Sequence, residues 1–126
     1  MNKDIQKLTK KSQEAMQAAA RLAESFKNSV VEPEHLLLEL VEQQDGVVPR
    51  ILEILKIDNK LVITELNKLI VNLPRLSQSQ ENTYASSRLQ KVFKIAEQEA
   101  VKNSDEFIST EHFLSRKEKT QNPARK

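Results

Sequence analysis

The chain has 126 residues, a formal net charge of +2, 38% apolar and 30% charged residues, one glycine, four prolines and no cysteine. This length suits a single domain and excludes a nucleotide-hydrolysing domain beside it. The lack of cysteine excludes disulfides, thiolate metal sites and a cysteine nucleophile, and the low glycine content favours an all-α fold.

The charge is spread unevenly along the chain. From Ser115 onward five basic residues stand against one acidic residue, a net of +4 that leaves −2 for the preceding body. We expect residues 115–126 to form a disordered basic tail. Because these charges do not gather on a folded face, the sequence predicts no nucleic-acid partner. The N-terminus has no apolar stretch of a signal peptide, so we expect a cytoplasmic protein without a membrane partner.

The first two predicted helices lie before residue 45. Thr9 can accept the unpaired N–H groups of a first helical turn, and the helix that follows ends near Asn28. Its apolar face consists of Ala15, Ala19, Leu22, Ala23 and Phe26. The second helix begins at Pro33, a residue favoured at the first helical position, and Glu34 complements the helix dipole. Its expected buried residues are Leu36, Leu37, Leu40 and Val41.

Two further helices are predicted after Gly46. Pro49 opens a short third helix, and Asp58 is placed to cap a fourth helix that Pro74 closes. The residues expected to face inward are Ile51, Leu52 and Leu55 in the third helix and Leu61, Leu66, Leu69 and Ile70 in the fourth.

A polar loop and a fifth helix complete the predicted elements. The segment Arg75–Ala85 is rich in Ser, Gln and Asn, which is typical of a loop. The fifth helix runs from Ser86 or Ser87 to Lys102. Its apolar side consists of Leu89, Val92, Phe93, Ala96 and Ala100.

The chain contains an internal repeat. The pair Glu34-His35 recurs as Glu111-His112 at an offset of 77 residues. Identical residues at this offset are Gln13 and Gln90, Ala19 and Ala96, Ala23 and Ala100, and Leu37 and Leu114. The pattern predicts a duplicated helical unit with pseudo-twofold symmetry, whose seam is a natural groove for a peptide.

The second copy lacks part of the first. After Leu114 no apolar pattern continues, so counterparts of the third and fourth helices are missing. We expect a domain over residues 1–114, with repeat one at about 9–73, a loop at 74–85 and a partial repeat two at 86–114. We therefore expect the chain to be a cut or frame-altered piece of a longer protein. We expect a monomer of marginal stability that tends to self-associate through the uncovered side of Leu37 and Phe113.

Four blocks of the sequence resemble a known family. They are Leu8–Ala15, Val31–Leu38, Gly46–Leu52 and Asp105–His112. In this order and spacing they resemble the N-terminal domain of Clp-type AAA+ chaperones, most closely that of the ClpB disaggregases, over about residues 5–114. Leu73-Pro74 before a long loop also resembles the disaggregase branch.

The resemblance implies a mobile domain above a hexameric ATP-driven ring. Such a domain captures unfolded or aggregated polypeptide before it is threaded. Gly46 is the only glycine, so the chain has no Gly-rich phosphate loop. We therefore expect no enzyme activity and no cofactor in this chain. An alternative is a stand-alone adaptor or regulatory protein that binds a Clp chaperone or its clients.

The resemblance also implies where substrate binds. The matching positions for substrate contact are Thr9, Asp105 and Glu111. Each has a plain structural interpretation as well: a helix N-cap, a turn residue and a favourable carboxylate in a first helical turn. A possible apolar groove is formed by Leu89, Phe93 and Ile95, which at helical spacing also fit an ordinary core.

The two histidines are the remaining candidates for chemistry. His35 and His112 occupy equivalent positions in the two copies, each just inside a helix N-terminus, where a histidine packs or caps more often than it binds a metal. No second histidine follows at the spacing of a zinc-protease helix. The sequence therefore predicts no metal site and no catalytic residue.

Overall fold

The structure, a computed structural model, describes residues 8–78, 83–103, 105 and 107–114. These residues form helices α2 (Lys10–Ser25), α3 (Pro33–Glu42), α4 (Val47–Ile54), α5 (Asn59–Val71) and α6 (Ser87–Lys102) and the short 3-10 helix η1 (Thr110–Leu114). Strands β1 (Val30–Val31) and β2 (Tyr84–Ala85) have two residues each and pair in parallel. The predicted all-α fold is confirmed. The expected tail at 115–126 lies outside the described residues.

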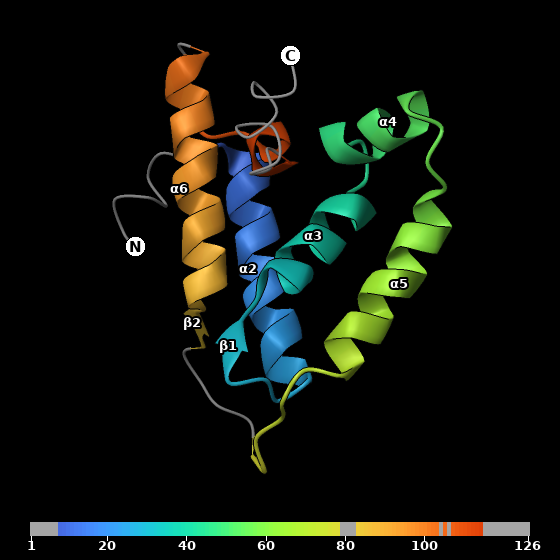
Figure 1. Ribbon diagram of the computed structural model, residues 1–126, viewed down its shortest axis with the longest axis vertical. Coiled ribbons are helices and arrows are strands. Elements are labelled where there is room, and N and C mark those ends of the chain that lie inside the picture. Colours follow the sequence, from blue (N-terminus) through green and yellow to red (C-terminus); the bar gives the residue numbers. More distant parts are fainter. Residues whose placement is uncertain (1–7, 79–82, 104, 106, 115–126) are drawn as a thin grey trace, which may run out of the picture.

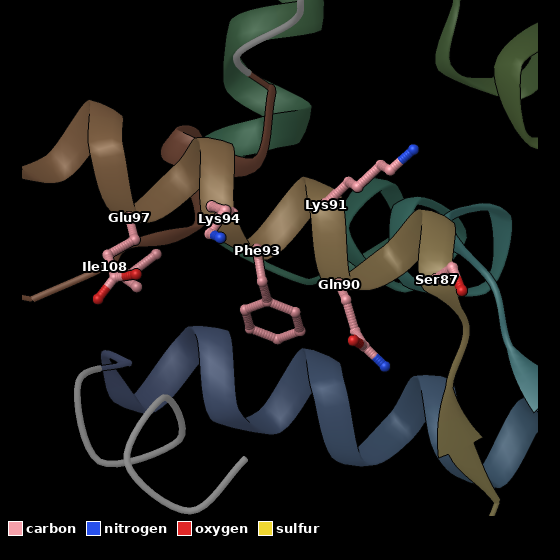
Figure 2. Close-up of a pocket in the computed structure, with 7 residues that line it drawn as sticks. All are labelled: Ser87, Gln90, Lys91, Phe93, Lys94, Glu97 and Ile108. Atoms are coloured by element: carbon pink, nitrogen blue, oxygen red, sulfur yellow. The ribbon is translucent and has the colours of Figure 1, made fainter.

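The helices form a compact arrangement around α2 and α3. Figures 1 and 2 show α2 and α6 side by side, with α3 beside α2 and α5 on the other side of α3. The short η1 packs against α6, and α4 contacts both α3 and η1. None of the helices in the described part of the chain is long and apolar enough to cross a bilayer.

Side-chain caps fix the starts of three helices, and the sequence predicted two of these caps, Thr9 and Asp58. Thr9 Oγ1 accepts the Ser12 N–H, a carboxylate oxygen of Asp58 accepts the Lys60 N–H, and Ser86 Oγ accepts the Leu89 N–H. Such caps typically contribute about 1 kcal/mol each.

The start of α4 differs from the prediction. The helix begins at Val47, two residues before Pro49, with Gly46 in an extended conformation at the N-cap. Pro49 therefore lies within the first turn, where a backbone N–H has no partner inside the helix. For this reason the proline is tolerated there without marking the helix start.

The core combines alanines of α2 and α6 with larger side chains of α3, α5 and α6. The buried apolar residues include Ala15, Ala19, Ala23, Leu36, Leu38, Leu40, Val41, Val48, Leu66, Ile70, Leu89, Phe93, Ala96 and Ala100. Helix α2 packs closely on α3. Leu38 and Val48 are also buried, although the sequence did not predict their burial.

Four leucines that were expected to be buried in the core are exposed or only partly buried. Leu55 is 61% exposed, Leu61 58% and Leu69 52%, and Leu37 is only partly buried. The reason is that α5 packs on α3 through one face, which carries Leu66 and Ile70. Leu55 stands at the C-cap of α4, where the chain turns toward α5.

The predicted duplication is confirmed by backbone pairing. Helices α2 and α6 have 16 residues each and start 77 residues apart. The Val31–Ala85 pair of the small sheet corresponds to an isolated parallel bridge between Leu8 and Ile108. The Ser86 N–H donates to the Val31 carbonyl at 2.9 Å, and the Thr9 N–H donates to the Ile108 carbonyl at 3.0 Å.

These two equivalent contacts join the copies. We call the contact of Val31 with Ala85 and Ser86 the first junction, and that of Ile108 with Leu8 and Thr9 the second junction. The second copy is the smaller one: its η1 has five residues where α3 has ten. Among the described residues, helices equivalent to α4 and α5 do not follow it.

Candidate polypeptide-binding site

The three residues expected to contact substrate meet at the second junction. Thr9 is bonded through its backbone N–H to the Ile108 carbonyl. Asp105 and Glu111 lie three residues before and three residues after Ile108. The junction thus brings the start of α2 to the segment that carries both carboxylates.

Thr9 acts as a helix cap at this site. Its Oγ1 lies 3.3 Å from the Ser12 N–H nitrogen, from which it accepts, and it donates to Ser12 Oγ at 3.1 Å. The Thr9 side chain is only partly buried. The capping role is therefore present, and part of the residue stays exposed.

Asp105 is held by a histidine. Its Oδ2 lies 2.9 Å from His112 Nε2, and its side chain is 48% exposed. His112 Nδ1 accepts the Ser109 N–H at 2.9 Å, so Nε2 is the nitrogen that donates to the carboxylate. His112 itself is 3% exposed. The carboxylate of Asp105 is thus fixed in place while part of it faces solvent.

The first copy repeats this arrangement with one change. His35 Nδ1 accepts the Glu32 N–H at 2.8 Å, and Nε2 donates to Asn28 Oδ1 at 2.8 Å. Burial lowers the pKa of His35, and the nearby Glu32 and Glu34 only partly oppose this. A neutral ring agrees with Nδ1 acting as an acceptor.

Both histidines therefore cap a turn, as the sequence predicted. Their side-chain partners, Asn28 and Asp105, were not predicted from the sequence. The available signal was a spacing of seven residues that occurs twice, from Asn28 to His35 and from Asp105 to His112. Within the described part of the chain, no three His, Asp or Glu side chains gather as metal ligands would.

A hollow on α6 lies next to the second junction. We call it the α6 hollow; its volume is about 710 Å³. Its lining residues are Ser87, Gln90, Lys91, Phe93, Lys94, Glu97 and Ile108. Figure 2 shows the Phe93 ring pointing from α6 toward α2, with Ile108 beside Glu97. Ile108 thus belongs to the junction and to the hollow, which mixes apolar surface with charge.

The predicted apolar groove is only partly represented in this hollow. Phe93 lines it, although the residue is 5% exposed and its ring meets Phe113 edge-on at a centroid distance of 5.3 Å. Leu89 is fully buried in the core, and Ile95 is partly buried on α6 outside the lining of the hollow. A ligand-binding role for these three residues stays a prediction.

A second, apolar cleft lies between the two copies. It has a volume of about 270 Å³ and is lined by Pro33, Glu34, Leu36, Leu37, Leu40, Leu66, Leu69, Val92 and Phe113. The sequence predicts an uncovered side of Leu37 and Phe113. Phe113 is only 8% exposed, because it packs against Phe93. Leu37 is partly buried and lines the cleft, and more exposed apolar side chains lie on α4 and α5 and between them.

Comparison with known proteins identifies the class. Residues 7–122 match the Clp repeat (R) N-terminal domain, and the chain belongs to this family. A relative is the chaperone protein ClpB of Bdellovibrio bacteriovorus (strain ATCC 15356 / DSM 50701 / NCIMB 9529 / HD100), 51% identical over 107 residues. That match covers 85% of this chain and 12% of the relative.

Solved structures show the same fold. The N-terminal domain (1–163) of the ClpV1 ATPase from E. coli EAEC has a TM-score of 0.83 at 25% identity, over 96% of this chain and 72% of that one. The ClpV N-domain in complex with a VipB peptide has a TM-score of 0.76 at 17% identity, over 90% and 68%. The chain spans about an eighth of the length of the curated ClpB relatives it matches.

Proposed function

We propose that this chain captures exposed segments of unfolded or aggregated polypeptide for a ClpB-like, ATP-dependent disaggregase. The observation that carries the proposal is the second junction. There the Thr9 N–H bonds to the carbonyl of Ile108, a residue that also lines the α6 hollow and lies between Asp105 and Glu111 in the sequence. A binding surface with charged residues at its edge and an apolar floor suits polypeptide segments of mixed composition.

The chemistry of this surface favours basic and aromatic segments. Asp105 and Glu111 are both exposed carboxylates. Phe107, between them, is 51% exposed. An exposed aromatic ring can contribute much of the affinity of a contact surface, whereas the charges contribute selectivity and speed of association.

The rest of the machine lies in other parts of a ClpB-like protein. We infer that a hexameric AAA+ ring supplies ATP hydrolysis and threading, and that this domain supplies the first contact. The complex of a ClpV N-domain with a VipB peptide supports the idea that the fold can hold a peptide. The cytoplasmic location expected from the sequence belongs to the same proposal.

The test measures binding of an unfolded, aromatic-rich protein to the full chain by fluorescence anisotropy. The variant is Thr9→Asn, Asp105→Asn and Glu111→Gln combined. Asparagine is a good N-cap, so α2 keeps its start. Asparagine at 105 copies Asn28, which already bonds its histidine in the first copy. We expect affinity to fall about tenfold, as the loss of two partly exposed charge contacts and one side-chain contact implies.

Glu65→Gln provides the matched control. Glu65 is exposed on α5, where its ion pair with Lys68 is open to solvent on both sides. The control should bind as the unchanged chain does, and all variants should keep their helical circular dichroism. Equal binding by the triple variant would contradict the site, and no binding by the unchanged chain would contradict the function.

A further inference from the structure

The turn between α4 and α5 carries a group of large apolar side chains on the surface. We call this group the apolar patch; its members are Ile54, Leu55, Ile57 and Leu61, each at least 42% exposed. Single exposed apolar residues are normal on a protein, whereas several in one place mark an interaction site. Figure 1 shows the α4–α5 turn at one edge of the molecule and α6 at the opposite edge.

A hollow lies directly beside the apolar patch. We call it the α4–α5 hollow; its volume is about 530 Å³, and its lining includes Pro49, Arg50, Glu53 and Asp58. Ile57 belongs to the patch and also lines the hollow, so the two features adjoin each other. Exposed side chains next to a hollow have the shape that a twofold contact requires, because the rotation sets the patch of each chain over the hollow of the other.

The charges around the patch and the hollow are balanced. Exposed acidic and basic residues occur there in equal number: Asp45, Glu53 and Asp58 against Arg50, Lys56 and Lys60. Within the part of the chain that the structure describes, none of the six takes part in an ion pair. A partner of strong net charge would be matched by charges of one sign. A balanced set instead lets acidic residues of one chain face basic residues of a second copy.

We infer that the apolar patch and the α4–α5 hollow form a self-complementary interface that pairs two copies of this chain. Apolar side chains of each copy enter the hollow of the other, and the surrounding charges set their mutual orientation. A standard interface has about 20 to 30 residues a side, and this surface is smaller, so the pair forms weakly and reversibly.

The pairing has a consequence for capture that rests on the proposed function, although the pairing itself does not. No residue of the apolar patch or of the α4–α5 hollow belongs to the second junction. A pair therefore presents two capture surfaces to one polypeptide, and two linked weak contacts hold a ligand more tightly than one.

Sedimentation equilibrium of the full chain at rising concentration measures the pairing. We expect a monomer–dimer equilibrium with a dissociation constant on the order of 0.1 to 1 mM, as suits a small interface. Two variants then carry charges of one sign around the patch. The acidic variant combines Arg50→Glu with Lys60→Glu, and the basic variant combines Glu53→Lys with Asp58→Asn, where asparagine keeps the N-cap of α5.

Each charge variant alone should pair about tenfold more weakly than the unchanged chain, because like charges then face each other. An equimolar mixture of the two variants should restore the dimer, because acidic and basic surfaces meet again. Arg21→Glu with Lys102→Glu is the matched control, since it makes the same change of charge on exposed residues of α2 and α6. The control should pair as the unchanged chain does, and all variants should keep their helical circular dichroism.

Three results would overturn the inference. They are an unchanged chain that stays monomeric up to about 1 mM, charge variants that pair as well as the unchanged chain, and a mixture that does not restore the dimer. These measurements contain no polypeptide ligand, so they are independent of capture. A monomer that still binds an unfolded protein contradicts the pairing alone, and a dimer that binds none contradicts the proposed function alone.

Discussion

His35 and His112 each accept a backbone N–H through Nδ1 and donate through Nε2 to a side chain seven residues earlier. In the first copy that side chain is a buried amide, Asn28, and in the second it is a half-exposed carboxylate, Asp105. This one change of residue turns an internal bond into part of a surface that can attract cations.

The buried His35 ring makes stability depend on pH. Its pKa lies below the ordinary value of 6.5, because burial disfavours the charged ring. Below pH 6.5 the unfolded chain therefore binds a proton that the folded chain does not. The free energy of unfolding should fall as pH drops below about 6.5 and be unaffected by this group above it.

Urea unfolding at several pH values between 7.5 and 5.5 measures this slope. Most carboxylates stay ionised in that range. In His35→Gln the slope should be flatter, although the variant is less stable at every pH because the capping bond to Glu32 changes. The same slope in both proteins would contradict a lowered pKa.

Asn28 and Asp105 are the residues to which the two histidines donate, and exchanging their residue types should have unequal effects on stability. Asn28→Asp places a carboxylate at a 2% exposed position against the Pro74 carbonyl and removes the donor of their bond. We expect a loss of about 2 kcal/mol or more, typical of a buried polar group left unpaired. Asp105→Asn is half exposed and keeps its bond to His112, so its cost should be within about 0.5 kcal/mol.

Thermal or urea unfolding of both variants checks this pair. The loss in free energy of unfolding should be larger for Asn28→Asp than for Asp105→Asn. A larger loss for Asp105→Asn than for Asn28→Asp would contradict the assigned hydrogen bonds.

At the scale of elements, the sequence could predict helices whose starts carry a side-chain cap. Thr9, Asp58 and Ser86 mark α2, α5 and α6 because their oxygens bond the first turn. The start of α4 has only the backbone of Gly46, and a proline within its first turn gave a misleading signal. Local sequence carries no information on which helix covers another, so the exposed side of α5 could not be predicted.

The turn between α4 and α5 exposes an apolar patch. Its members are Ile54, Leu55, Ile57 and Leu61, which are 70%, 61%, 42% and 58% exposed. If the isolated domain self-associates, we expect this patch to be the contact rather than Phe113, which is buried. Apolar surface gathered in one place favours association.

Sedimentation velocity over a range of concentrations tests the patch. Leu55→Lys with Leu61→Lys should remove any dependence of the sedimentation coefficient on concentration and cost little stability. Leu37→Lys serves as the comparison at the apolar cleft. Loss of self-association in that variant alone would contradict the assignment to the α4–α5 turn.

At the scale of the whole molecule, the offset of 77 residues predicted the twofold relation of the copies. The family resemblance, and not the offset, gave Thr9, Asp105 and Glu111 as candidate contact residues, and the structure brings the segments that carry them to the second junction. The pairing of Leu8 with Ile108 could not be predicted, because it joins residues 100 positions apart without a local signal.

The most direct test of polypeptide capture at the second junction is nuclear magnetic resonance mapping of the full chain. Amide chemical shifts would be recorded while an unfolded, aromatic-rich protein is added. We expect the largest changes at Thr9, from Asp105 to His112 and along the hollow side of α6, with α5 unaffected. Changes centred on α4 and α5, with none at the second junction, would contradict the account.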